Sequence, residues 1–149
     1  MTRHAMQHVS ISACGLAVGA ILPWLACAAD TVSEAPASTV QNLMVRDLAG
    51  VSGKEVRMLT VEYRAGGASL PHRHDAQVFV YVLAGTVKMQ VAGSPEVTLG
   101  PGGAFYEGPE DIHVVSANAS RTEPARILVV MVRDKNKPVS TDVAPTRPQ

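Results

Sequence analysis

His72 and His74, two residues apart, are the side chains in this sequence best placed to bind a metal together. Side chains at positions i and i+2 of an extended strand project from the same face, so both imidazoles could reach one ion. His113 lies in a later segment with strand character, and the other two histidines lie within the first eight residues. If that N-terminal segment is removed on export, only these three histidines stay in the mature chain. We therefore predict a divalent metal bound by His72, His74 and His113.

The N-terminal segment has the features of a secretory signal. A weakly basic start is followed by an apolar run from about residue 9 to 25 and by small residues around Ala28. We predict a signal peptide over residues 1–28, a periplasmic or secreted mature protein, and no membrane attachment after cleavage. Two alternatives are a retained anchor, although roughly 17 apolar residues are short for a bilayer that needs about 20, and a lipoprotein acylated at Cys27.

Composition restricts the function of the remaining chain. Basic and acidic residues balance at 13 each, with no basic cluster, so we expect no nucleic-acid partner. Both cysteines precede the predicted cleavage site, which excludes a disulfide framework in the mature chain. We predict a linker over residues 29–40, one folded domain over 41–135, and a flexible, proline-containing tail over 136–149.

The folded part has the pattern of strands. Runs rich in β-branched and aromatic residues alternate with Gly and Pro clusters, which favours an all-β antiparallel sandwich or barrel. Two of the runs, 78–83 and 127–132, are apolar on both faces, so we expect one face in the core and the other against a second sheet or a partner subunit. The predicted strands are 56–63, 78–83, 87–91, 114–115 and 127–132.

The histidines and the glycines around them resemble the two sequence motifs of the cupins. The matching positions are Gly66, His72, His74 and Gly85 in the first motif and Gly102 and His113 in the second. The second motif is looser, because Gly108 and Glu110 stand at its proline and glycine positions and its asparagine is one place late at Asn118. The resemblance spans about residues 56–132. It implies a double-stranded β-helix, a small jelly-roll barrel with a small-molecule site inside, and a homodimer of the kind common among cupins.

One departure from the first motif bears on the metal. Val78 stands where the family has a glutamate that often completes the metal shell. The three histidines that are left resemble the sites of cupins that handle oxygen with an Fe(II) centre bound by histidines alone. Gln77 is a candidate fourth ligand if a β-bulge turns it inward. Glu107, six residues before His113, is a candidate catalytic acid near the pocket mouth, with a solvated turn residue as the alternative.

The metal and the reaction are left open by the sequence. Imidazole ligands suit Fe, Zn, Ni and Cu, and Mn also occurs at oxygen-rich sites, so any of the five is a candidate. The resemblance implies a small metal-dependent, dioxygenase-like enzyme acting on an aromatic, diketone or similarly oxygen-rich molecule. The alternative is a noncatalytic cupin module that binds a metal or small ligand for sensing, storage or stress response. A weaker third hypothesis is a scaffold for protein association.

Overall fold

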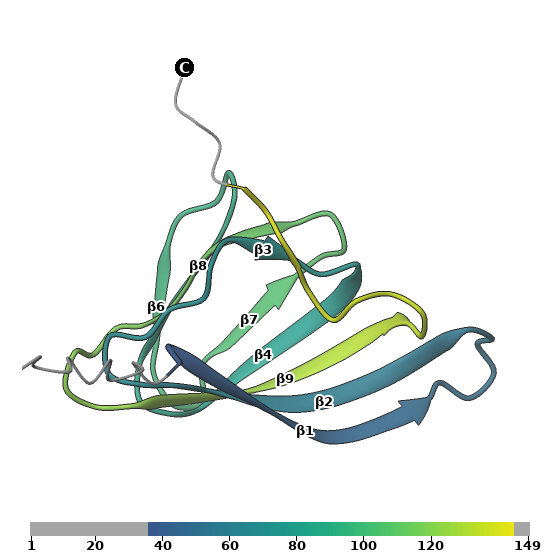
Figure 1. The fold of residues 1–149 in the computed structure, drawn as a ribbon, viewed down its shortest axis with the longest axis horizontal. Coiled ribbons are helices and arrows are strands. Elements are labelled where there is room, and N and C mark those ends of the chain that lie inside the picture. The colour runs from purple at the N-terminus through teal and green to yellow at the C-terminus, as the bar shows by residue number, and fades with distance from the viewer. Residues whose placement is uncertain (1–35, 145–149) are drawn as a thin grey trace, which may run out of the picture. The chain divides into compact units, whose positions relative to one another are not determined.

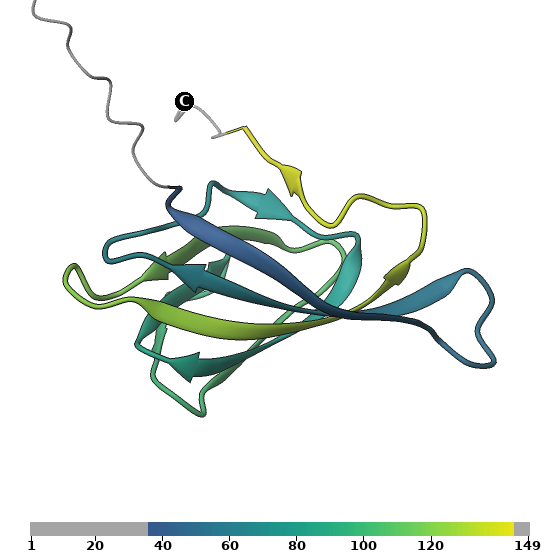
Figure 2. The same ribbon diagram turned by 60° about the horizontal axis from the view of Figure 1, so that its bottom comes forward.

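Two antiparallel sheets of five strands each form the folded domain in a computed structural model that describes residues 36–144 (Figures 1 and 2). One sheet has the strand order β1 (Ser38–Asp47), β2 (Lys54–Tyr63), β9 (Ala125–Asp134), β4 (Ala76–Ala84) and β7 (Ala104–Glu107). The other has the order β10 (Thr141–Asp142), β3 (His72–Arg73), β8 (Ile112–Asn118), β5 (Val87–Val91) and β6 (Val97–Leu99). The described residues therefore form a jelly-roll β-barrel, which confirms the predicted fold class.

Every predicted strand run lies within an observed strand. The four longer runs lie in β2, β4, β5 and β9, and residues 114–115 lie in the middle of β8. Pattern analysis missed β1 because nearly all of its residues are exposed, so its sequence carries no alternation of buried and exposed positions. It also missed β3, β6, β7 and β10, which have only two to four residues each.

The domain is longer at both ends than the predicted range of 41–135. β1 begins at Ser38, within the expected linker, and pairs with β2 over almost its whole length. β10 lies within the expected tail and pairs with β3, and the adjacent Val143 donates its backbone N–H to Pro71. Backbone hydrogen bonds hold both segments in place. Residue composition does not predict such bonds, because they do not depend on side-chain type. The predicted signal peptide and both cysteines lie outside the described residues.

β4 shows how the core is filled. Val78, Val80 and Val82 point inward and are at most 3% exposed, whereas the alternating Phe79 and Tyr81 are 49% and 48% exposed. One apolar face of this strand thus lies in the core, as predicted. The buried apolar core as a whole consists of Leu59, Tyr63, Ala76, Val78, Val80, Val82, Val87, Met89, Ala125, Ile127, Val129 and Met131.

The outward face of the β1-containing sheet carries an apolar row across four strands. Met58, Val130, Phe79 and Tyr106 are successive partners in the registers of β2, β9, β4 and β7, and we call them the outer apolar row. The rings of Phe79 and Tyr106 lie 5.5 Å apart between centroids. No described residue belongs to a helix long and apolar enough to cross a membrane.

Candidate metal centre and its cavity

Strand pairing brings the three predicted histidines together. His72 on β3 lies directly opposite His113 on β8, and their ring centroids are 5.2 Å apart. His74 follows β3 immediately, and its ring centroid lies 4.8 Å from that of His72. Residues that are about forty positions apart in the sequence are thus cross-strand neighbours, as is needed for side chains that share one ion.

Glu107 joins the histidines from the other sheet. It is the last residue of β7, is 2% exposed, and lies opposite Val78 in the β4–β7 register. Its Oε2 is 3.8 Å from His74 Nε2 and 3.1 Å from His113 Nδ1. A carboxylate is therefore present beside the position where the cupin motif has its glutamate, but it comes from the neighbouring strand.

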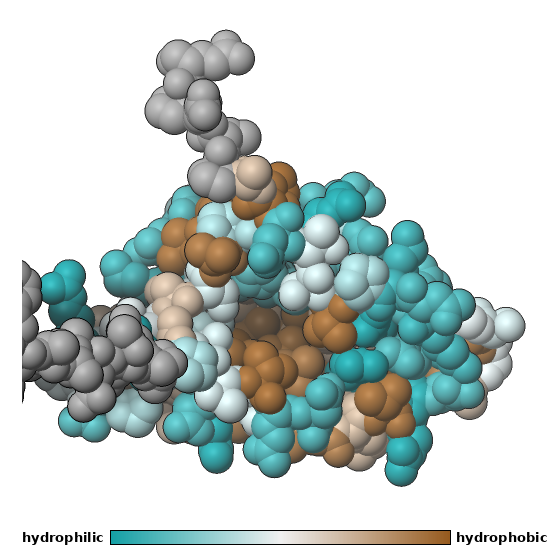
Figure 3. Space-filling model, in the orientation of Figure 1, coloured by the Kyte–Doolittle hydropathy of each residue, from teal (hydrophilic) through white to brown (hydrophobic). Residues whose placement is uncertain are grey.

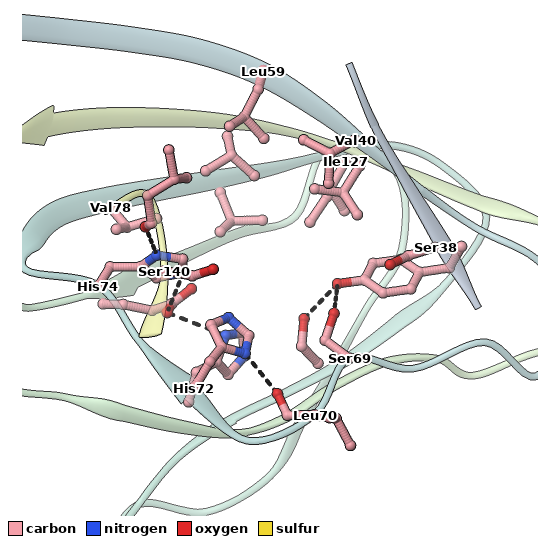
Figure 4. A pocket seen from close by; sticks show the side chains of 18 of the residues that line it. Ser38, Val40, Leu59, Ser69, Leu70, His72, His74, Val78, Ile127 and Ser140 are labelled. Carbon is pink, nitrogen blue, oxygen red and sulfur yellow. Dashed lines mark hydrogen bonds and ion pairs between the residues drawn. The ribbon is translucent and has the colours of Figure 1, made fainter. Parts of the chain in front are cut away.

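Backbone carbonyls orient two of the imidazoles. His72 Nδ1 lies 2.7 Å from the carbonyl oxygen of Leu70 (Figure 4). His74 Nδ1 lies 2.6 Å from the carbonyl oxygen of Val139. A carbonyl oxygen can only accept, so Nδ1 carries the proton on both rings and Nε2 keeps a free lone pair. This arrangement is typical of metal-binding histidines, whose second nitrogen is fixed by an outer partner.

Buried atoms without partners indicate that a positive ion fits here. Glu107 Oε2 and both ring nitrogens of His113 are buried and make no hydrogen bond, although the carboxylate and the ring are close. Leaving such groups unpaired is costly in free energy. The ligand atoms of His72, His74 and Glu107 all lie within 4.8 Å of one another. Two imidazoles and one carboxylate form a donor set that suits a divalent transition metal, and the His113 ring lies beside them.

Burial also prepares His72 for metal binding. Desolvation lowers the pKa of His72, and the neighbouring His74 and His113 lower it further. The hydrogen bond to the Leu70 carbonyl and the Glu107 carboxylate act in the opposite direction and do not outweigh burial. Because metals bind neutral imidazole, the lowered pKa keeps His72 in its binding form.

The two other predicted site residues take positions that differ from expectation. Gln77 is exposed on the outward face of β4, where it accepts a hydrogen bond from the Tyr106 hydroxyl, so the structure does not bring it to the histidines. No bulge displaces Gln77, because its register with Val132 is regular. Glu107 is buried among the imidazoles and is not the solvated turn residue of the alternative hypothesis. Sequence analysis placed Glu107 near the pocket mouth but could not show its contacts with His74 and His113, which depend on how β7 pairs with β4.

The histidines and Glu107 line one cavity of about 390 Å³ that opens to the surface. Figure 3 shows a hollow with hydrophobic side chains inside it, and Figure 4 shows Leu59 and Ile127 on its wall. The remaining apolar lining comes mainly from Val61, Val78, Val80, Val129 and Met131. Five hydroxyl side chains also line the cavity: Ser38, Tyr63, Ser69, Ser116 and Ser140. The site thus combines metal donors with largely apolar space that opens to the surface, as small-molecule sites commonly do.

Comparisons with known proteins agree with this geometry. A family model described as a cupin domain matches residues 59–131. The DMSP lyase DddQ from Ruegeria pomeroyi has a similar structure, with 21% identity, a TM-score of 0.58, and coverage of 74% of this chain and 54% of that chain. A cupin-like protein from Thermotoga maritima is 20% identical, with a TM-score of 0.58 and coverage of 74% and 78%.

An oxalate oxidase in complex with glycolate is also similar in structure. It is 24% identical, with a TM-score of 0.57 and coverage of 74% of this chain and 57% of that chain. The present chain therefore spans just over half the length of the lyase and the oxidase. No curated protein matches its sequence. At these identities the structural likenesses establish the fold.

Substitution of the donors should empty the metal site. We expect His72→Ala and Glu107→Gln to reduce the metal that copurifies with the protein from near-stoichiometric to trace amounts, because each change removes a donor atom from the group. Elemental mass spectrometry on protein purified without added metal or chelator measures this. Gln77→Ala is the matched control and should keep its metal. Loss of metal in that control would place Gln77 in the site and contradict the assignment.

The metal-free protein should lose stability as the pH falls below about 6.5. The unfolded chain then binds a proton at His72 that the folded chain, with its lowered pKa, does not bind. The free energy of unfolding therefore decreases toward acid. Urea denaturation in the presence of a chelator, from about pH 7 to about pH 5, should show a steeper loss for the wild type than for His72→Asn. Equal slopes would contradict a lowered pKa of His72 in the folded protein.

Proposed function

The folded part of this chain is a cupin domain and so belongs to the cupin superfamily. We propose that this domain binds one divalent transition metal through His72, His74, His113 and Glu107. We propose further that it oxidises a small molecule bound beside the metal. The observation that carries the proposal is the convergence of buried donor atoms without partners at one part of the cavity. Fe, Mn, Zn, Ni and Cu are all compatible with this donor set, and an oxygenase requires a redox-active member of the group.

The side chains of the domain have separate tasks in this proposal. A bound metal would supply Lewis-acid and redox chemistry at coordination positions left open by the protein. Glu107 offsets part of the positive charge, and the Leu70 and Val139 carbonyls hold two imidazoles in the required tautomer. Leu59, Ile127 and Val129 shield the body of a bound molecule from water.

The kind of molecule follows from the donors and the cavity. A compound with adjacent oxygen atoms can occupy open metal positions through both of them. Glycolate, which is bound in the similar oxalate oxidase structure, has such a hydroxyl and carboxylate pair. We therefore propose as substrates those catechols, diketones and hydroxy acids that are small enough for a cavity of about 390 Å³.

A noncatalytic module that binds a metal or small ligand is the second candidate. It is favoured by the use of Glu107 as a metal donor, because that carboxylate is then unavailable as a general base. Among the described residues that line the cavity, Asp142 is the other carboxylate, and it is exposed on β10. For either function we propose export to the periplasm or the exterior, on the basis of residues 1–28.

Oxygen uptake distinguishes the two candidates. We expect mature protein loaded anaerobically with Fe(II) to consume O₂ in an electrode cell when given one of a panel of catechols, diketones and hydroxy acids. His74→Ala should abolish the uptake, because it removes a metal donor, and Gln77→Ala should retain it. If none of the five metals supports uptake while metal and ligand both bind, the protein is a noncatalytic module.

We also propose that the protein forms a homodimer through the outer apolar row. Phe79, Tyr106 and Met58 lie on one outward sheet face, and Phe79 and Tyr106 are each nearly half exposed. Sedimentation of the mature protein should give a dimer at micromolar concentration, and Phe79→Lys should shift it to a monomer because it places a charge in the apolar contact. Val97→Lys, on the other sheet, is the control. A monomeric wild type at that concentration would contradict the proposal.

A further inference from the structure

A cluster of three hydroxyl groups lies in the cavity away from the metal donors. The Tyr63 hydroxyl is 2.6 Å from Ser116 Oγ and 3.3 Å from Ser69 Oγ. Tyr63 is 2% exposed and Ser116 is 5% exposed, and all three residues line the cavity. In Figure 4, Ser69 and His74 lie on opposite sides of the cavity, with Leu59 and Ile127 along its wall between them. The cavity therefore has a metal end, an apolar middle and a hydroxyl end.

A bulge in β8 turns both ends of this strand toward the same cavity. His113 and Ser116 are three residues apart, so regular alternation would place them on opposite faces. The register between β5 and β8 shifts between Gln90 and Val91, and His113 and Ser116 are consequently both buried. Three residues of extended chain span about 10 Å, which sets the separation between the metal end and the hydroxyl end.

The hydroxyl cluster has an unused hydrogen atom. Three hydroxyl groups carry three protons, and the two oxygen–oxygen contacts need only two of them. The third has a poor partner in the Sδ atom of Met89, a weak acceptor 3.8 Å from Ser116 Oγ. The cluster can therefore donate one hydrogen bond to a ligand and can also accept from one.

The charge of the lining limits which ligand group can lie at that end. No lysine or arginine occurs among the described residues that line the cavity, whereas Glu107 and Asp142 both do. A carboxylate or phosphate at the hydroxyl end would lose its hydration without gaining a cation. A neutral hydroxyl or carbonyl group would meet a matching partner there.

We propose that Tyr63, together with Ser69 and Ser116, determines specificity by recognising a neutral polar group at the end of a ligand whose other end chelates the metal. The substrate class is thus a small molecule with a pair of oxygen donors, a short apolar body and an uncharged hydroxyl or carbonyl terminus. This inference rests on the proposed function, because the metal must hold the first end. A site built to bond a hydroxyl group discriminates strongly against an analogue that lacks it.

Three matched catechols test the proposal. They share the chelating diol and differ in a side chain that is propyl, hydroxypropyl or carboxyethyl. Isothermal titration calorimetry under nitrogen, on the full mature protein loaded with redox-inert Zn(II), measures each affinity. We expect the hydroxypropyl compound to bind about five- to tenfold more tightly than the propyl compound, and the carboxyethyl compound to bind most weakly.

Variants separate recognition from a structural role. Tyr63→Phe should abolish the preference for hydroxypropyl over propyl while leaving propyl binding within about twofold, because only the hydroxyl contact is lost. Ser116→Ala provides a second variant with the same expected loss of preference. Tyr81→Phe, the same change on the outward face of β4, should leave the preference intact. A purely structural role for Tyr63 would lower the melting temperature of Tyr63→Phe without altering the ratio of affinities.

The outcomes identify which proposal fails. Equal affinities of the wild type for the propyl and hydroxypropyl compounds would overturn recognition by the hydroxyl cluster and leave metal binding in place. If Tyr63→Phe and Ser116→Ala both still bind the hydroxypropyl compound more tightly than the propyl compound, recognition by the hydroxyl cluster is likewise overturned. Zinc uptake without binding of any catechol would also overturn it. If zinc itself does not bind, the proposed function fails together with this inference.

Discussion

A buried carboxylate surrounded by imidazoles, where the two sheets meet, is the constraint on which the rest of this structure depends. Glu107 is 2% exposed, and its Oε2 has no hydrogen-bond partner although His113 Nδ1 is 3.1 Å away. An isolated negative charge in such surroundings is unfavourable, and a divalent ion satisfies the carboxylate and the neutral rings at once. The pairing of β3 with β8 and of β7 with β4 serves to hold these donors in one place.

The segments beyond the predicted domain take part in that arrangement. The Val139 carbonyl fixes the His74 ring, and β10 covers the edge of β3 directly beside His72. Residue composition suggested a flexible tail here, because prolines and small polar residues are common in such tails. The backbone nevertheless finds partners on the exposed edge of β3, and these hydrogen bonds do not depend on side-chain type.

The same barrel separates two kinds of polarity within one cavity. Metal donors lie toward one end of β8, and Ser116, which contacts the Tyr63 hydroxyl, is three residues further along the strand than His113, a backbone rise of about 10 Å. Apolar side chains from β2 and β9 lie between them. The bulge in β8 changes which side chains of that strand face the cavity, and so allows one strand to contribute to both ends. The bulge arises from the register between β8 and its neighbouring strand.

The sequence alone determined the fold class and the histidine pair. The β-branched and aromatic run of residues 78–83 favours a strand whatever lies on its two faces, and the i, i+2 spacing of His72 and His74 places both rings on one side of the chain. It also singled out Glu107 and Val78 as unusual. Only the tertiary structure decided that these two residues are opposite one another, that Gln77 faces outward, and that Ser116 faces the cavity. The physical reason is that spacing within one strand is fixed by local geometry, whereas register between strands depends on contacts made by the whole barrel.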